Sequence, residues 1–185
     1  MHIFVHPKGE KMDIFFEQII SKKKSVADVI KLLLIYIGGL LLASTVTFFV
    51  LTFAPSFLLF GLMICCFIFY GIIKLSGLFN IEFEYSVTNG TLDVDKIINR
   101  NSRSRLISVE LGEVDGFEKY SPEKYAGREF DLKINASGSG SSELYCITVR
   151  HPSKGRVLVI FEPDDRVLGA TKKALPFLLR KKAEE

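Results

Sequence analysis

Residues 32–73 contain no Lys, Arg, Asp, Glu or His, and this uncharged run restricts the possible folds more than any other feature of the sequence. The hydrocarbon core of a bilayer is about 30 Å thick and an α-helix rises about 1.5 Å per residue, so one membrane span takes about 20 residues. The run is long enough for two spans. Ala54-Pro55-Ser56 lies in its middle, where proline interrupts a helix. The sequence therefore predicts a transmembrane helical hairpin at 32–78, with helices over residues 32–53 and 57–78.

Two other interpretations of this run are a cleaved signal peptide and a helical hairpin buried in a soluble protein. A signal peptide has an apolar region of about 7 to 15 residues near the start of the chain, whereas this run begins later and lasts longer. A soluble domain almost never needs so long a stretch without charge. Two membrane spans are therefore the favoured interpretation.

The distribution of lysines predicts the orientation of the hairpin. The residues before the first span include Lys8, Lys11, Lys22, Lys23, Lys24 and Lys31, whereas the connection between the spans carries no charge. Short positively charged segments stay on the cytosolic side. We therefore expect a multi-pass protein of the cell membrane with both termini in the cytosol.

Small side chains recur every four residues on both predicted spans. They are Gly39, Ala43 and Thr47 on the first span and Gly61 and Cys65 on the second. Small faces let two helices approach closely, so we expect packing within the hairpin, with homodimerisation as the alternative. Because the uncharged run holds no ionisable residue that could mark an ion or proton path, the hairpin is predicted to be an anchor.

The N-terminal cytosolic segment, residues 1–31, contains a second periodic stretch. The apolar residues between Met12 and Ile20 have helical spacing, which predicts a short amphipathic helix. This helix would either lie at the membrane interface, with Lys22-Lys23-Lys24 near anionic headgroups, or pack on the domain that follows. The sequence leaves open whether translation starts at Met1 or at Met12.

Residues 79–185 have the pattern of a separate β-rich domain. Apolar and polar residues alternate over 81–87, and Asn89-Gly90 favours a tight hairpin turn. Further strands are expected at 91–98, 105–111, 114–120, 129–134, 144–150 and 156–161, with a Gly/Ser-rich loop at 135–142. A final helix is predicted to begin at Asp164 or Asp165 and to be kinked or divided at Pro176.

About seven strands followed by one helix is the order of elements in a pleckstrin-homology-like (PH-like) barrel. The stretches 85–96 (Tyr-Ser-Val-Thr-Asn-Gly-Thr-Leu-Asp-Val-Asp-Lys) and 105–114 (Arg-Leu-Ile-Ser-Val-Glu-Leu-Gly-Glu-Val) resemble the start of bacterial PH-like domains joined to paired membrane helices. From Met12 the chain resembles a family of bacterial two-span membrane proteins with a C-terminal PH-like domain. The resemblance implies an α+β membrane protein, with a transmembrane hairpin and a PH-like barrel or sandwich, and it brings no catalytic residues.

One basic cluster is a candidate binding site for a lipid or a partner. Arg100, Arg103 and Arg105 follow the second predicted strand of the domain. Some PH domains hold phosphoinositide headgroups with basic residues in a loop between strands, although the loop here differs. The carboxylates of Glu82, Glu84, Asp93 and Asp95 are expected to neutralise the cluster across strands.

The sequence contains no motif for catalysis, a metal or a cofactor. The only histidines are His2, His6 and His151, the three cysteines have no metal-ligand spacing, and there is no Gly-rich phosphate loop. From Leu75 onward the chain has 17 basic and 17 acidic residues, a balance that argues against nucleic acid as a partner. No enzymatic activity, metal or cofactor is therefore expected.

These observations favour two hypotheses. In the first, the chain is a membrane-anchored, non-catalytic binding or assembly module, whose PH-like domain presents a cytosolic surface to a protein, a lipid headgroup or another copy of itself. In the second, it is an accessory subunit of a membrane transporter or envelope enzyme and acts through its transmembrane helices.

Overall fold

The computed structural model describes residues 15–138 and 143–184 and shows an α+β protein with two four-stranded sheets. The first sheet contains, in spatial order, β1 (Phe15–Ser21), β2 (Ile81–Thr88), β3 (Thr91–Ile98) and β4 (Ser102–Glu110). The second contains β5 (Gly116–Lys119), β7 (Tyr145–His151), β8 (Gly155–Phe161) and β6 (Leu132–Asn135). All pairings are antiparallel except that of β6 with β8.

Two long apolar helices form the predicted hairpin. The first, α1 (Val26–Phe53), and the second, α2 (Leu58–Gly77), are joined by a 3-10 turn at Pro55–Phe57. Helix α1 begins six residues earlier than expected because Ser25 forms a capping box with Asp28. Both helices are long and apolar enough to cross a membrane, with mean hydropathies of 2.2 and 2.5.

The predicted amphipathic helix at 12–20 is wrong for the residues that the structure describes, because Phe15–Ser21 forms strand β1. This strand pairs along its whole length with β2, with Phe15 opposite Thr88 and Ser21 opposite Glu82. Its side chains alternate between exposed and half-buried. The alternative expectation, that this segment packs on the β-rich domain, is the one that the structure supports. Residues 12–14, like His2 and His6, lie outside the described residues.

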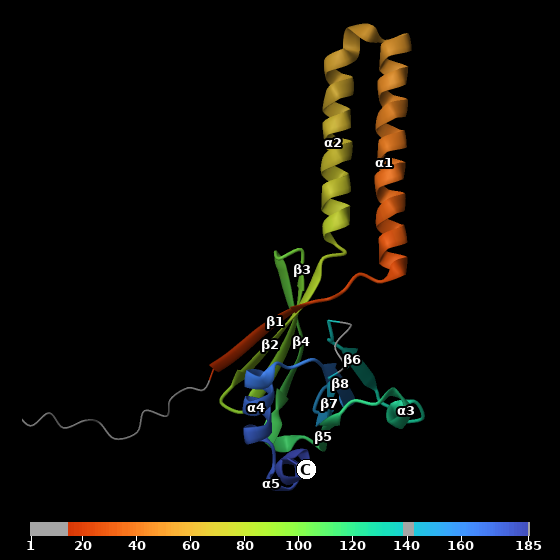
Figure 1. Ribbon diagram of the computed structural model, residues 1–185. Helices are drawn as coiled ribbons and strands as arrows, with labels where there is room; N and C mark the ends of the chain where they lie inside the picture. Colours follow the sequence, from red (N-terminus) through yellow and green to blue (C-terminus); the bar gives the residue numbers. More distant parts are fainter. Residues whose placement is uncertain (1–14, 139–142, 185) are drawn as a thin grey trace, which may run out of the picture.

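The hairpin is therefore inserted into the β-rich domain and does not precede it. Strand β1 leads into α1, and α2 leads back into β2, the strand next to β1. The predicted boundary at residue 79 is corrected accordingly: the domain includes β1 as well as everything after α2. Figure 1 shows the helical pair projecting from one end of the sheets, with α4 (Asp165–Ala174) and α5 (Phe177–Glu184) near the other end.

The main core lies between the two sheets and is closed by α4. Tyr85, Leu92, Val157 and Phe161 are fully buried there, and Val167 joins them from α4. The Tyr85 hydroxyl donates a hydrogen bond to the carbonyl of Ala136 and accepts one from the backbone N–H of Glu162 at 3.3 Å.

A smaller cluster covers the outer side of the second sheet, where Tyr125 of the short helix α3 (Pro122–Tyr125) packs on Cys146, Leu158 and Ile160. Strand β8 is thus covered on both faces.

Several local predictions are confirmed. Asn89 and Gly90 have φ values of 49° and 91° and form the turn between β2 and β3, as expected for Asn-Gly. The Asp164 carboxylate accepts a hydrogen bond from the N–H of Val167 at 2.8 Å and caps α4. Pro176 separates α4 from α5. The last residues of the predicted Gly/Ser-rich loop, 139–142, lie outside the described residues.

Candidate functional site

The three candidate arginines lie along one edge of the first sheet. Arg100 belongs to the turn between β3 and β4, whereas Arg103 and Arg105 lie within β4, which begins earlier than predicted. Arg103 and Arg105 lie opposite Ile97 and Asp95 of β3. Because residues that face each other across neighbouring strands point to the same side of a sheet, both arginines lie on the outer face of the sheet, away from the core.

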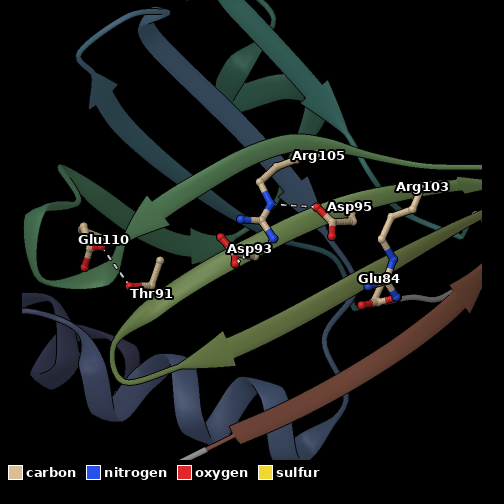
Figure 2. Close-up of polar contacts among 7 residues, drawn as sticks. All are labelled: Glu84, Thr91, Asp93, Asp95, Arg103, Arg105 and Glu110. Carbon is tan, nitrogen blue, oxygen red and sulfur yellow. Dashed lines mark hydrogen bonds and ion pairs between the residues drawn. The ribbon is translucent and has the colours of Figure 1, made fainter.

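The four predicted carboxylates pair with these arginines, and Figure 2 shows Glu84, Asp93 and Asp95 beside Arg103 and Arg105. Arg105 Nε lies 3.0 Å from Asp95 Oδ1 and its Nη2 lies 3.1 Å from Asp93 Oδ2. Arg103 donates to Glu84 across the intervening strand β3. Arg100 makes a longer contact, 3.6 Å from its Nε to Glu82 Oε1. The prediction that carboxylates neutralise the cluster is confirmed, and this face is an ion-pair network with one more carboxylate than arginine.

An irregularity in strand pairing shapes this network. The register between β3 and β4 shifts between Val94 and Asp95, so that Leu106 has no partner directly opposite it. Such a bulge bends a strand and increases its twist. It allows one guanidinium, that of Arg105, to reach both Asp93 and Asp95.

Glu84 and Asp95 are the buried members of the network. They lie directly opposite each other on β2 and β3, with residue exposures of 4% and 7%. Burial raises the pKa of Glu84, the positive charge of Arg103 counteracts this in part, and the nearby negative charges of Glu17 and Asp95 raise it further. Hydrogen bonding to Asp95 raises the pKa of Arg105. Because more than half of each arginine side chain is exposed, each ion pair contributes only about 0 to 1 kcal/mol to stability.

A second cluster of titratable groups surrounds Tyr125. The Tyr125 hydroxyl and Lys124 Nζ both donate hydrogen bonds to Glu118. Although burial opposes it, these bonds lower the pKa of the Glu118 carboxyl. Burial raises the pKa of the Cys146 thiol beside it. A nucleophilic cysteine needs a lowered pKa and access to solvent, so the geometry matches a structural role for Cys146.

The small residues of the hairpin lie between its two helices. A Cβ atom on Gly39 would lie 2.2 Å from Cδ1 of Ile72, and one on Gly61 would lie 3.0 Å from Cγ2 of Val50. Ala43 is buried, with an exposure of 6%.

Polar atoms join the same two helix faces. Thr47 Oγ1 lies 3.6 Å from Cys65 Sγ, and the Cys65 thiol also contacts the Ala43 carbonyl at 3.8 Å. The five candidate packing residues therefore contribute to contacts within one hairpin.

A polar hollow of about 460 Å³ lies where the hairpin joins the sheet. Three segments line it: the connection from β1 to α1, the connection from α2 to β2, and the turn between β3 and β4. They contribute Lys22, Lys24, Asn80, Asn99 and Arg100, with Glu82 beside them. The sequence predicts a site at Arg100 and a lipid-facing position for the lysines, but it does not predict that these residues meet, because they are far apart in the chain.

The described residues contain no group of three or more His, Cys, Asp and Glu side chains that could hold a metal ion. In comparisons with known proteins, one family model, described as a bacterial PH-like domain (DUF6106), matches residues 12–180. No curated protein and no solved structure matches the chain.

Proposed function

This chain belongs to the bacterial PH-like domain family DUF6106, and from that premise we propose that it is a membrane-anchored, non-catalytic binding or assembly module. In this proposal the hairpin spans the membrane, and the PH-like domain presents a cytosolic surface to a protein, a lipid headgroup or another copy of itself. The family alone does not determine a function, because one fold serves many.

The observation that carries the proposal is the insertion of the hairpin between two neighbouring strands. Four residues separate β1 from α1, and three separate α2 from β2. Backbone hydrogen bonds continue through these connections, from Lys22 N to Ile81 O at 2.9 Å and from Asn99 N to Asn80 O at 2.8 Å. A domain held by two short connections has a fixed orientation and distance relative to its anchor. Such a geometry suits a module that presents one surface close to the bilayer.

The charge distribution supports a cytosolic position for the domain. Lys22, Lys23, Lys24 and Lys31 flank the start of α1, whereas the connection between α1 and α2 is uncharged. Positive residues near the ends of a span favour the cytosolic side. Both ends of the hairpin join the same sheet, so β1 and all strands after α2 lie on that side.

A non-catalytic role is supported by how the polar groups are engaged. The buried carboxylates of the first sheet face arginines, and the Cys146 thiol lies in an apolar cluster. These arrangements stabilise the fold and do not aim a titratable group at a substrate pocket.

Site-specific photo-crosslinking in native membranes tests the proposal. A photoreactive residue at Ile19 or Asn101 would report contacts of the domain, because both positions are exposed. The same residue at Phe48, which is 67% exposed on α1, would report contacts of the hairpin. Cross-links from the domain to a protein or to a second copy support a binding module. Cross-links to protein from Phe48 alone support the accessory-subunit hypothesis.

Two further measurements complete this test. Exchange of residues 26–77 for an unrelated two-helix hairpin should preserve the cross-links from the domain if the helices serve only as an anchor. Extraction of membranes with alkaline carbonate should leave the chain in the pellet. Recovery of the chain in the soluble fraction, or of no cross-linked partner or oligomer from any position, would overturn the proposal.

A further inference from the structure

The hollow at the junction of hairpin and sheet has the position of a headgroup site if the hairpin spans a bilayer. Helix α1 begins at Val26 and α2 ends at Gly77, so the residues just outside these ends would lie at the depth of the lipid phosphates. Figure 1 shows the turn between β3 and β4 reaching toward the lower end of α2.

Positive charge dominates this hollow. Lys22, Lys24 and Arg100 line it, and Glu82 is the one carboxylate among the described residues that do so. The ammonium groups of Lys22 and Lys24 form no hydrogen bond or ion pair with any described residue. Arg100 has a side chain that is 87% exposed, and its contact with Glu82 is long, at 3.6 Å. Within the described part of the chain, two ammonium groups without an ion pair and one guanidinium with a single long ion pair are thus available to a ligand.

Arg100 therefore differs from the other two arginines of the cluster. Arg103 and Arg105 pair closely with Glu84 and with Asp93 and Asp95 further along the sheet. Neither is among the residues that line the hollow. The geometry separates a structural pair of arginines from one that faces the junction.

Contacts within the chain hold the hollow in shape. Asn99 and Arg100 have φ values of 52° and 58°, in the left-handed region that few residues other than glycine adopt. The Asn99 side chain packs against Gly77, where an added Cβ would lie 2.7 Å from Nδ2 of Asn99. The turn is thus fixed to the end of α2. A preformed site loses less conformational entropy on binding than a mobile one.

From this arrangement we propose that the junction hollow binds a phosphate-bearing anionic headgroup through Lys22, Lys24 and Arg100, with the amides of Asn80 and Asn99 as additional donors. Guanidinium and ammonium groups both bind phosphate oxygens. This inference rests on the proposed membrane anchoring, which places the hollow at the bilayer surface. The shared chemistry is a phosphate ester, and its source is either a bilayer lipid or a soluble compound.

Lipid selectivity of the full chain tests this site. The protein is reconstituted in phosphatidylcholine vesicles, and its association with spin-labelled phosphatidylglycerol is compared with that of spin-labelled phosphatidylcholine. The variant Lys22→Gln/Lys24→Gln/Arg100→Gln should lose most of the preference for phosphatidylglycerol, by roughly fivefold per charge removed. A control variant with the same change in charge, Lys173→Gln/Lys181→Gln/Lys182→Gln, alters lysines of α4 and α5 and should keep the preference.

A single substitution that is expected to have the opposite effect on lipid preference keeps the inference testable if the triple variant does not fold. Glu82→Gln removes the one carboxylate of the hollow and should increase the preference for phosphatidylglycerol. Glycerol 1-phosphate, added to the protein in detergent, tests the soluble source by its effect on the temperature of unfolding. Stabilisation that the triple variant loses and the control keeps would assign the site to a soluble phosphate ester.

The outcomes separate this inference from the function on which it rests. A chain that stays in the membrane after carbonate extraction, but shows neither lipid selectivity nor stabilisation by glycerol 1-phosphate, overturns the site alone. Equal loss of selectivity in the triple variant and the control also overturns it. A chain that is soluble without detergent overturns both.

Discussion

Ser21 and Glu82 lie directly opposite each other in the antiparallel ladder of β1 and β2, although 61 positions separate them in the chain. The Ser21 hydroxyl donates to Glu82 Oε1 at 3.4 Å. The hairpin of α1 and α2 lies between these two residues in the chain. The helical hairpin thus takes the place of a connection between two neighbouring strands of the first sheet.

The first prediction concerns replacement of the whole hairpin by a short turn. Lys22 and Ile81 follow Ser21 and Glu82 as the next pair, with Lys22 N donating to Ile81 O. Replacing residues 23–80 with Asn-Gly should therefore close a two-residue β-hairpin. We expect a soluble, monomeric domain that unfolds cooperatively in urea, as measured by circular dichroism and size-exclusion chromatography.

A shorter chain provides the control for this replacement. A truncated chain that starts at Ile81 lacks β1 and leaves β2 as an unpaired edge strand, which favours aggregation. It should be less soluble and less stable than the chain with the Asn-Gly turn. Equal stability of the two would contradict the assignment of β1 to the domain.

The second prediction concerns Gln18, which ties β1 to the start of α4. Its side-chain amide donates to the carbonyl of Glu162 at 3.1 Å and accepts from the N–H of Asp164 at 2.7 Å. Gln18→Ala leaves both backbone groups without this partner, so we expect the free energy of unfolding to fall by about 1 to 3 kcal/mol. Urea unfolding of the domain with the Asn-Gly turn measures this.

The neighbouring residue Glu17 is the matched control. Its side chain is on the exposed face of β1, and Glu17→Ala should change the free energy of unfolding by no more than about 0.5 kcal/mol. Equal effects at positions 17 and 18 would show that the bridge made by Gln18 does not hold the strand.

Strand β1 shows why part of the fold could not be predicted from the sequence. Phe16 and Ile20 point toward the core, but Phe15 and Ile19 are exposed, so apolar residues follow each other and fit a helical period. The strand is stabilised by its long-range pairing with β2, and such pairing leaves no local signal. By contrast, the Asn89-Gly90 turn, the Asp164 cap and the break at Pro176 act through neighbouring residues, and the sequence predicts all three.

The charged face of the first sheet could likewise be predicted only in part. Alternation along β2 and β3 suffices to predict that carboxylates neutralise the arginines. The individual partners of Arg105 depend on the bulge between Val94 and Asp95, which no local motif marks. The junction hollow could not be predicted at all as one site, because Lys22, Asn80 and Arg100 meet only after the hairpin has been placed within the sheet.

The third prediction concerns the pH dependence of stability at Glu84. Burial raises the pKa of this carboxyl above its ordinary value of 4.5. A group whose pKa is raised on folding contributes stability that is fully present below its unfolded pKa and is lost as the pH rises through its folded pKa. Glu84→Gln removes this loss, so the stability of the variant relative to the native chain should increase from pH 4 toward neutral pH.

Unfolding in urea at several pH values measures this difference. Glu110→Gln serves as the control, because it changes an exposed carboxylate at the end of β4 in the same sheet. A difference between Glu84→Gln and the native chain that stays constant with pH would show that Arg103 fully offsets the burial of Glu84, and a difference that decreases as the pH rises would show that Arg103 outweighs it.

The fourth prediction uses two adjacent glycines of α1 to test the packing of the hairpin. Gly39 faces Ile72, whereas a Cβ on Gly38 would meet nothing within 4 Å. Gly39→Leu should therefore push the helices apart, at a cost of about 1 to 3 kcal/mol for overpacking, and Gly38→Leu should not.

The proximity of Thr47 to Cys65 provides the measurement. In a Cys66→Ser background, Thr47→Cys should form an oxidative cross-link to Cys65 within one chain. Its yield should fall with Gly39→Leu and stay unchanged with Gly38→Leu, whereas cross-links between two chains would indicate that the small faces of the helices mediate dimerisation.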